Sequence, residues 1–328
     1  MPETLTMPMR VLIAALPLRH QPGKFRDLLI EAGLEPVDPP REENSGELSE
    51  SCVADLLPGC DAMIAGSERL QGPLLEKCNK LRIIARTGVG YDAIDMPATN
   101  RLGITVTITP GVNQESVAEQ AFGLLLGFTR RIAVNAADIA RGGWDRTLPI
   151  PLRGKTIGLI GLGRIGQAMV PRAQAFGMKV IAYDPYLKES PFGANVPMLS
   201  LDDVIRAADV LSLHVPITSE TRHLIRQETI EAMKPGAILL NTSRGGLVKE
   251  SDLISALKTG RIAGACLDVS DPEPPLPLSE LRTLPNVVIS PHLGGIDSKS
   301  MADMADLAAW CVVEKLSGRD PAHCIVKS

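Results

Sequence analysis

Three ionisable side chains stand just after apolar stretches of the sequence, and their types suit chemistry on a small organic acid. Arg244 lies in the segment NTSRGG (241–246), Glu273 in DVSDPEP (268–274) and His292 in SPHLGG (290–295). A guanidinium can hold a carboxylate through two parallel hydrogen bonds, and an imidazole can give and take the hydroxyl proton that accompanies hydride transfer. A carboxylate beside that imidazole would orient the ring and stabilise its charged form. Together the three residues predict a site for an α-keto or α-hydroxy acid.

Each of these residues also has a plainer interpretation. Arg244 could cap a helix or lie on the surface, a lone histidine is more often structural, and a glutamate in a proline-rich loop is ordinarily just solvated. Their shared position favours the chemical interpretation, because ligands of open α/β sheets bind outside the carboxyl ends of the strands. All three residues follow predicted strands, so we expect them at one edge of a sheet.

A glycine motif at the same kind of position predicts a dinucleotide site. The residues GLGRIG (161–166) match GxGxxG, follow an apolar strand and open a helix, which is the context that this fingerprint requires. Gly161 permits the tight turn, Gly163 lets backbone amides approach a pyrophosphate, and Gly166 lets helix and strand pack closely. Asp184, 18 residues after Gly166, would accept the ribose 2′-hydroxyl and repel a 2′-phosphate, which favours NAD over NADP. The alternative is a glycine turn without a ligand.

The elements that must position these residues alternate between strands and helices, which predicts parallel sheets and an α/β fold. In the first third of the chain we expect strands at 10–16, 61–65, 81–85 and 104–108. A series of six more strands is expected at 155–163, 178–183, 210–214, 237–241, 264–269 and 287–290. Helices are expected at 25–33, 74–78, 116–131, 132–141, 164–176, 201–208, 228–233 and 250–258. Pro171 should kink or break its helix.

Length and composition restrict the class of protein. The 328 residues, 45% of them hydrophobic, are enough for two domains. A net charge of −4 and a pI near 5.8 give no electrostatic case for binding nucleic acid or an anionic membrane. Six cysteines form no CxxC pair and five histidines are scattered, so we expect no metal site and a reducing, cytoplasmic compartment. The apolar stretch 11–18 is too short to span a membrane and is interpreted as a first strand.

The sequence resembles the D-isomer-specific 2-hydroxyacid dehydrogenase family, and most of all its phosphoglycerate-dehydrogenase-type members. The resemblance covers about residues 60–300, and its motifs are RTGVGYDAID (86–95), SVAE (116–119), GKTIGLIGLGRIG (154–166), AYDP (182–185), HVPIT (214–218), LLNTSRGGLV (239–248), GACLDV (264–269), DPEPP (271–275) and SPHLGG (290–295).

The resemblance implies a fold of two Rossmann-like or flavodoxin-like domains with parallel sheets, the cofactor domain being inserted into the substrate domain. We expect the substrate domain at 1–104 and 295–328 and the NAD-binding domain at 105–294, with a helical segment near 113–145 that forms a homodimer. The 36 residues after His292 suffice for one closing helix, at about 299–316. They do not suffice for the regulatory domain that some phosphoglycerate dehydrogenases carry.

The resemblance also implies roles for individual residues. Arg244 would bind the substrate carboxylate and carbonyl, His292 would be the acid/base and Glu273 its partner. Backbone amides around Val89 and Gly90 would hold the substrate carboxylate from the other domain. The NAD site would comprise Gly161, Gly163, Arg164, Ile165, Gly166, Asp184, Val215, Pro216, Thr221, Thr242, Ser243, Asp268 and Gly294, with Asp268 meeting the nicotinamide carboxamide.

The expected activity is reversible hydride transfer between NAD(H) and a small 2-hydroxy or 2-keto acid, similar to that of phosphoglycerate dehydrogenase. One alternative is a hydroxypyruvate or glyoxylate reductase, because family members that handle 3-phosphoglycerate often have Arg-Ser where this chain has Ala65-Gly66. Another, of a different class, is an NAD-sensing, corepressor-like binding protein without catalysis.

Overall fold

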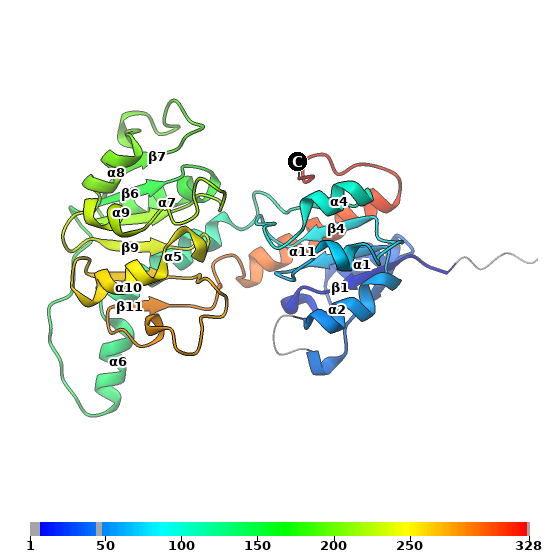
Figure 1. The fold of residues 1–328 in the computed structure, drawn as a ribbon, viewed down its shortest axis with the longest axis horizontal. Coiled ribbons are helices and arrows are strands. Elements are labelled where there is room, and N and C mark those ends of the chain that lie inside the picture. The colour runs from blue at the N-terminus through cyan, green and yellow to red at the C-terminus, as the bar shows by residue number, and fades with distance from the viewer. Residues whose placement is uncertain (1–6, 44–47, 327–328) are drawn as a thin grey trace, which may run out of the picture. The chain divides into compact units, whose positions relative to one another are not determined.

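The computed structural model of the chain describes residues 7–43 and 48–326, and these form two compact units (Figure 1). The first unit comprises the described residues up to Asn113 together with those from Ile296 onward, and the second comprises Gln114–Gly295. The chain therefore enters the second unit once and leaves it once. The structure shows an α/β fold with two parallel sheets, as the sequence predicted.

The predicted boundary at 104/105 is wrong, because the strand that follows it belongs to the first unit. Strand β5 (Thr105–Thr107) pairs in parallel with β4 (Ile83–Arg86), with Thr105 opposite Ile83. Its ladder hydrogen bonds hold the segment in the first sheet, and the change of unit comes after Asn113. The second boundary lies one residue later than predicted, at 295/296.

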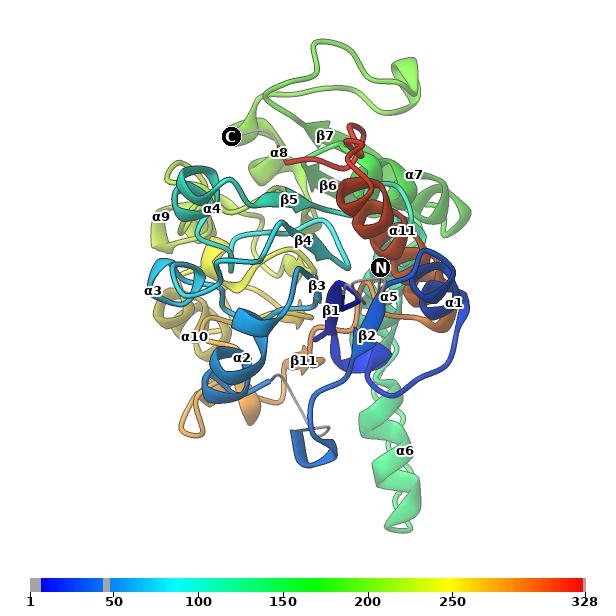
Figure 2. The ribbon, with the colours of Figure 1, turned by 90° about the vertical axis from the view of Figure 1, so that its right-hand side faces the viewer.

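The first unit is a five-stranded parallel sheet with helices on both faces. Its strand order is β2-β1-β3-β4-β5, where β1 is Arg10–Ile13, β2 is Glu35–Val37 and β3 is Ala62–Ala65. Alternate side chains of β1 enter opposite cores: Val11 packs with α1 (Lys24–Glu31) and α11 (Ser298–Leu316), which lie side by side in Figure 2. Leu12 packs with α2 (Glu50–Leu56), α3 (Gly72–Leu75) and α4 (Met96–Leu102). Sequence reasoning missed β2, a three-residue edge strand containing Pro36, which is tolerated at an edge.

The second unit contains a six-stranded parallel sheet built from the six strands that were expected. These are β6 (Thr156–Ile160), β7 (Lys179–Tyr183), β8 (Val210–Leu213), β9 (Ile238–Asn241), β10 (Gly264–Leu267) and β11 (Val287–Ile289). Their order is β11-β10-β9-β8-β6-β7, so β7 lies on one side of β6 and β8 to β11 follow in turn on the other. In such sheets the crevice at this reversal is the usual ligand site.

Helices cover both faces of this second sheet. One face is packed by α5 (Gln114–Thr129) and α7 (Arg164–Ala175), the other by α8 (Leu201–Ala207), α9 (Gln227–Ala232) and α10 (Glu250–Lys258). The helix does not break at Pro171, since α7 continues for four residues beyond it, and the alternative expectation of a kink stays a prediction. A proline removes one backbone hydrogen bond, and here four neighbouring side chains of α7 are buried in the core, namely Ala168, Met169, Val170 and Ala173.

The last helix of the predicted helical region differs from its neighbour in burial. Eight residues of α5 are buried, whereas α6 (Ile132–Ala140) buries none of its side chains. Figures 1 and 2 show α6 standing out from the rest of its unit. Among the described residues, no helix is long and apolar enough to cross a bilayer.

Candidate active site

The candidate residues of the second unit gather at the carboxyl edge of its sheet. They follow the ends of the parallel strands: the glycine motif, which runs into α7, follows β6, Asp184 follows β7, and Val215 follows β8. Arg244 follows β9, and His292 follows β11. A linear series of motifs spread over some 130 residues of sequence therefore becomes one edge of one sheet.

His292 and Glu273 form a direct contact. Nδ1 of His292 lies 2.8 Å from Oε2 of Glu273, and the two side chains are 34% and 37% exposed. The other carboxylate oxygen of Glu273 accepts the backbone N–H of Ser270 at 3.2 Å, which fixes the carboxylate on its own loop. With Nδ1 turned to the carboxylate, Nε2 is the nitrogen available for proton exchange with a substrate. The partial exposure of His292 leaves its ring accessible to a substrate.

Arg244 is positioned by a turn that a buried asparagine closes. The side-chain amide of Asn241 donates to the carbonyl of Arg244 at 2.9 Å, and its oxygen accepts the N–H of Ser243 at 3.0 Å. The guanidinium donates to the carbonyl of Ser243 at 2.7 Å. Gly245 packs so tightly that a Cβ there would lie 2.0 Å from the backbone of Ser270. The loops of Arg244 and Glu273 are therefore in contact, and Asn241 is a positioning residue that sequence reasoning did not single out.

The three glycines of the fingerprint have different surroundings. Gly161 has φ +97°, and a Cβ there would lie 2.5 Å from the carbonyl oxygen of His214. A Cβ at Gly166 would lie 2.2 Å from the carbonyl oxygen of Gly161, whereas a Cβ at Gly163 would have no atom within 4 Å. Packing thus requires glycine at 161 and 166, whereas Gly163 faces open space. That space lies at the N-terminus of α7, where Arg164 begins the helix and free amides favour an anion.

Asp184 holds the glycine loop in addition to any contact with ribose. Its Oδ2 accepts the N–H of Leu162 at 2.8 Å, and its Oδ1 accepts the N–H of Tyr186 at 2.9 Å. A carboxylate has about four acceptor sites, so both oxygens keep capacity for a ribose hydroxyl. The carboxylate therefore joins the ends of β6 and β7 at the place where the sugar was expected.

The loops after β8 and β9 add further candidates. The hydroxyl of Thr221 donates to the carbonyl of Pro216 at 2.7 Å, and that of Ser243 donates to the carbonyl of Leu213 at 2.8 Å. The hydroxyl of Thr242 is buried and has no hydrogen-bond partner among the described residues. The residues present suit NAD. Thr242 offers a buried hydroxyl for a hydrogen bond with a ligand, and a phosphate can approach the backbone at Gly163 and the start of α7.

His214, at the end of β8, has a different environment from His292. Its Nε2 lies 2.8 Å from the hydroxyl of Ser212, and its Nδ1 is buried without a partner among the described residues. Desolvation lowers the pKa of His214 to about 4. This histidine is therefore neutral at physiological pH. It belongs to the HVPIT motif, but nothing in the motif predicted that state.

Val89 and Gly90 lie in the first unit, on the loop that follows β4. The preceding residue, Gly88, has φ +139° and donates its N–H to the hydroxyl of Thr109 at 2.8 Å. The side chain of Val89 is partly exposed. The contact of these two residues with a substrate carboxylate stays a prediction.

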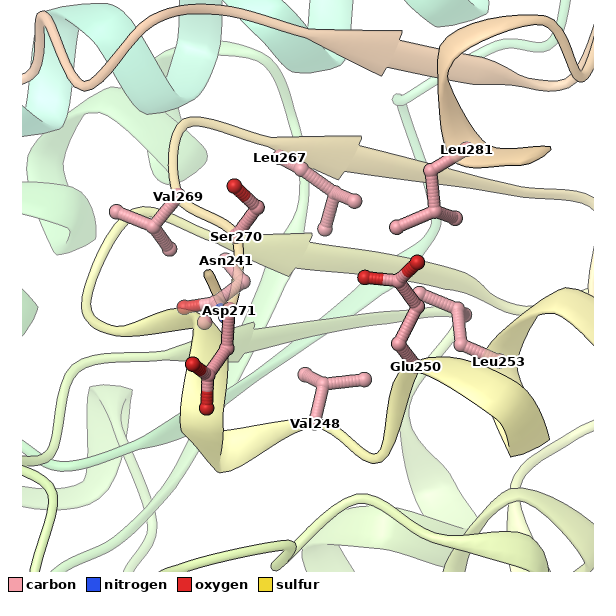
Figure 3. A pocket seen from close by; sticks show the side chains of 10 residues that line it. Asn241, Val248, Glu250, Leu253, Leu267, Val269, Ser270, Asp271 and Leu281 are labelled. Atoms are coloured by element: carbon pink, nitrogen blue, oxygen red, sulfur yellow. The ribbon is translucent and has the colours of Figure 1, made fainter. Parts of the chain in front are cut away.

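A small cavity is lined in part by residues that follow β9 and β10 (Figure 3). Its volume is about 20 Å³, which is room for about one water molecule. It is lined by Asn241, Gly245, Val248, Glu250, Leu253, Leu267, Val269, Ser270, Asp271 and Leu281. A cavity of this size cannot hold a substrate or a dinucleotide. Among the described residues, no group of three or more potential ligands could hold a metal ion.

Comparison with known proteins decides the family. The model of the NAD-binding domain of D-isomer specific 2-hydroxyacid dehydrogenases matches residues 122–294, which include the glycine motif, Arg244, Glu273 and His292. The chain belongs to this family. As a 2-hydroxyacid dehydrogenase it is an NAD-dependent oxidoreductase, and the resemblance inferred from the motifs is confirmed.

The relatives of this dehydrogenase have several activities. It is 40% identical to a glyoxylate reductase of Thermococcus litoralis over 91% of this chain and 90% of that protein. It is also 40% identical to a hydroxypyruvate reductase of Thermotoga maritima, over 77% of this chain and 84% of that one. A D-3-phosphoglycerate dehydrogenase of Methanocaldococcus jannaschii is 40% identical over 83% of this chain, which spans about half (52%) of that relative.

A solved structure supports the fold. The TT0316 protein from Thermus thermophilus is 39% identical and superimposes with a TM-score of 0.87 over 97% of this chain and all of that chain. The fold, with its two parallel sheets, is therefore shared with a known structure.

Proposed function

We propose that this dehydrogenase interconverts small, unphosphorylated 2-keto and 2-hydroxy acids of the glyoxylate and hydroxypyruvate type, with NAD(H) as its cofactor. The observation that carries the proposal is the 2.8 Å contact between His292 and Glu273. The loop of Glu273 also contacts the loop of Arg244. The overall similarity to glyoxylate and hydroxypyruvate reductases along most of their length supports the substrate class.

In this mechanism the guanidinium of Arg244 binds the carboxylate of the keto acid and orients its carbonyl group. The imidazolium of His292 donates the proton from Nε2 to the carbonyl oxygen as that oxygen becomes a hydroxyl. Glu273 accepts a hydrogen bond from Nδ1, so it stabilises the charged ring and maintains its orientation. Bound NADH supplies the hydride that completes the reduction. In the reverse direction His292 takes the hydroxyl proton.

The loop after β3 supports an unphosphorylated substrate. There the N–H of Gly66 donates to the carboxylate of Glu68 at 2.6 Å, and that side chain is only 2% exposed. Arg19 lies 3.5 Å from the same carboxylate. Burial raises the pKa of Glu68, while hydrogen bonds from backbone amides and the charge of Arg19 oppose that rise. A carboxyl group at this loop occupies an amide and a cation that a phosphate would need.

The decisive test of the chemistry is His292→Ala. Removing a general acid/base lowers turnover by about 10²- to 10⁴-fold, so we expect kcat for glyoxylate reduction to fall by that order. NADH binding, followed by fluorescence, should be retained. The matched control is His323→Ala, an exposed histidine of the first unit, which should leave turnover unchanged. Normal turnover by the His292 variant would remove the basis of the proposal, and NADH binding without any turnover by the wild type would favour the sensing protein.

The substrate is tested by a panel of keto acids. Initial rates of NADH and NADPH oxidation should be compared for glyoxylate, hydroxypyruvate, pyruvate, 2-ketoglutarate and 3-phosphohydroxypyruvate. We expect glyoxylate and hydroxypyruvate to give the highest kcat/KM, with NADH preferred because Asp184 repels a 2′-phosphate. A strong preference for the phosphorylated acid would instead support the phosphoglycerate-dehydrogenase-type activity that the third relative represents.

We also propose a homodimer formed through α6 and the segment after it, and a reducing, cytoplasmic compartment. Large apolar side chains of this region are exposed, and the two most exposed are Trp144 (79%) and Leu148 (89%). Exposed apolar surface of this kind marks an interaction site. The compartment is supported by the six cysteines, all of which are buried free thiols.

A further inference from the structure

The loop that carries His292 closes around one buried carboxylate. Asp268 is 1% exposed, and the N–H groups of Leu293 and Gly294 donate to its Oδ1 and Oδ2 at 2.9 Å and 2.7 Å. The N–H of His292 donates to the carbonyl oxygen of the same residue at 2.8 Å. Three successive amides thus surround Asp268, as in the backbone nests that bind anions. Asp268, which the family resemblance assigned to the nicotinamide, therefore also holds the loop of His292.

This support is needed because the backbone of His292 is strained. Its φ of +54° lies in the left-handed region, which residues with a Cβ adopt at a cost. Such a conformation persists when the surrounding structure over-determines it. Gly294 is part of the same arrangement, since a Cβ there would lie 2.9 Å from Oδ2 of Asp268. The orientation of the His292 ring therefore depends on where Asp268 is held.

Two side chains hold Asp268 from another direction. The hydroxyl of Ser290 donates to Oδ1 at 2.5 Å, a length typical of a strong bond to a charged carboxylate. The amide of Gln120, on α5, donates to the hydroxyl oxygen of Ser290 at 2.9 Å and reaches Oδ1 of Asp268 at 3.4 Å. Ser290 gives its single hydrogen to the carboxylate, so it can only accept from Gln120. The relay runs in one direction, from Gln120 through Ser290 to Asp268.

We propose that Gln120 is a positioning residue for proton transfer. Through Ser290 and Asp268 it holds the His292 loop so that the imidazole keeps its contact with Glu273. This inference rests on the proposed function, in which His292 carries the proton. It assigns to α5 a part in the chemistry besides its part in the core.

The test compares Gln120→Leu, which removes the amide, with Gln120→Glu, which keeps the shape but replaces the donor by an acceptor. A misplaced catalytic group loses up to about 10²-fold in rate, so we expect kcat for glyoxylate reduction to fall about tenfold or more in both variants. The affinity for NADH, measured by fluorescence, should stay within about twofold. Because a looser contact with Glu273 stabilises the imidazolium less, the alkaline limb of the pH profile of kcat should move to lower pH.

Three further variants make the result specific to the relay. Gln227→Leu makes the same change at an exposed glutamine of α9, whose amide donates to Glu231, and should leave kcat and the pH profile unchanged. Ser290→Thr keeps the hydroxyl and should retain kcat, whereas Ser290→Ala should lose it. In the Ser290→Ala background, Gln120→Leu should cost less than it costs in the wild type, because the two residues share a chain of hydrogen bonds and only the direct 3.4 Å contact of Gln120 with Asp268 remains.

The outcomes separate this inference from the proposed function. Wild-type kcat and pH profile in Gln120→Leu, alongside an inactive His292→Ala, would overturn the positioning role and leave the proposed function standing. A loss confined to NADH affinity would also overturn it, since it would show that the relay serves the cofactor. Thermal unfolding reports whether each variant is folded. Should Gln120→Leu unfold, the isosteric Gln120→Glu and the pair Ser290→Ala and Ser290→Thr measure the same relay.

Discussion

At the scale of single residues, two histidines of the second unit show how surroundings determine the chemistry of one side chain. His292 is about one-third exposed and has a carboxylate at Nδ1, so its charged form has a partner. His214 has a hydroxyl at Nε2 and, within the described part of the chain, a buried Nδ1 without a partner, and desolvation lowers its pKa to about 4. In the proposed reaction the first exchanges a proton with the substrate, while the second remains neutral.

The lowered pKa of His214 predicts how the stability of the fold depends on pH. Between its ordinary value of 6.5 and about 4, the unfolded chain binds a proton that the native chain does not. Stability therefore rises with pH across this window and is lost as the pH falls from 6.5 towards 4, by up to about 1.4 kcal/mol per pH unit. Urea unfolding of the wild type and of His214→Gln across the same range of pH checks this. The variant should show a shallower dependence, and equal slopes would contradict the assignment.

At the scale of elements, the turn from β6 into α7 must allow close packing of the backbone and also leave room for a ligand. The glycine motif alone does not show which glycine meets which requirement. Gly161 and Gly166 are needed so that strand, turn and helix can approach, since an added Cβ would meet backbone oxygen atoms at 2.5 Å and 2.2 Å. Gly163 meets no such limit, and its open side lies at the start of the helix. Gly161 and Gly166 thus serve the fold, and Gly163 is free to serve a ligand.

Two alanine substitutions separate these requirements. Gly166→Ala should destabilise the protein by about 1–3 kcal/mol, because the backbone must shift to accommodate the methyl group, and it should weaken NADH binding as a consequence. Gly163→Ala should keep nearly wild-type stability but weaken NADH binding about tenfold or more, because the methyl group occupies the approach to the phosphates. Thermal unfolding and fluorescence titration with NADH measure the two effects. Equal losses of stability in both variants would contradict the assignment of Gly166 to packing and of Gly163 to ligand binding.

At the scale of the whole molecule, α6 exposes an apolar surface that its own unit leaves uncovered. It buries none of its residues, although Ile132, Val134 and Ile139 are large apolar side chains with about half of their surface exposed. Its neighbour α5 is buried on several sides and contains Gln120 of the relay. A second copy packed on α6 would cover this surface.

Charged substitutions on α6 and the segment after it test the homodimer. Ile139→Asp combined with Trp144→Asp should convert a dimer to a monomer in light scattering after size exclusion, because burying an unpaired carboxylate opposes association. The matched control is Ile30→Asp on α1, which is similarly exposed at 59% and should leave the mass unchanged. A monomeric wild type would refute the proposed assembly.

Much of the fold, and the types of the candidate catalytic residues, could be predicted from the sequence by itself, because local patterns carry that information. Apolar runs and helix signals located all six strands of the second sheet, and the predicted helix 250–258 coincides with α10. The glycine spacing and the residues that follow the strands pointed to one sheet edge. These features depend on neighbouring residues of the chain.

What only the tertiary structure decided depends on residues far apart in sequence. The change of unit after Asn113 follows from the pairing of β5 with β4, and the continuity of α7 through Pro171 accompanies its packing into the core. The contact of Gln120 with Ser290 joins positions 170 residues apart. No local pattern encodes such a contact, since a hydrogen bond to a distant partner exists only when the whole sheet has placed both residues at the same edge.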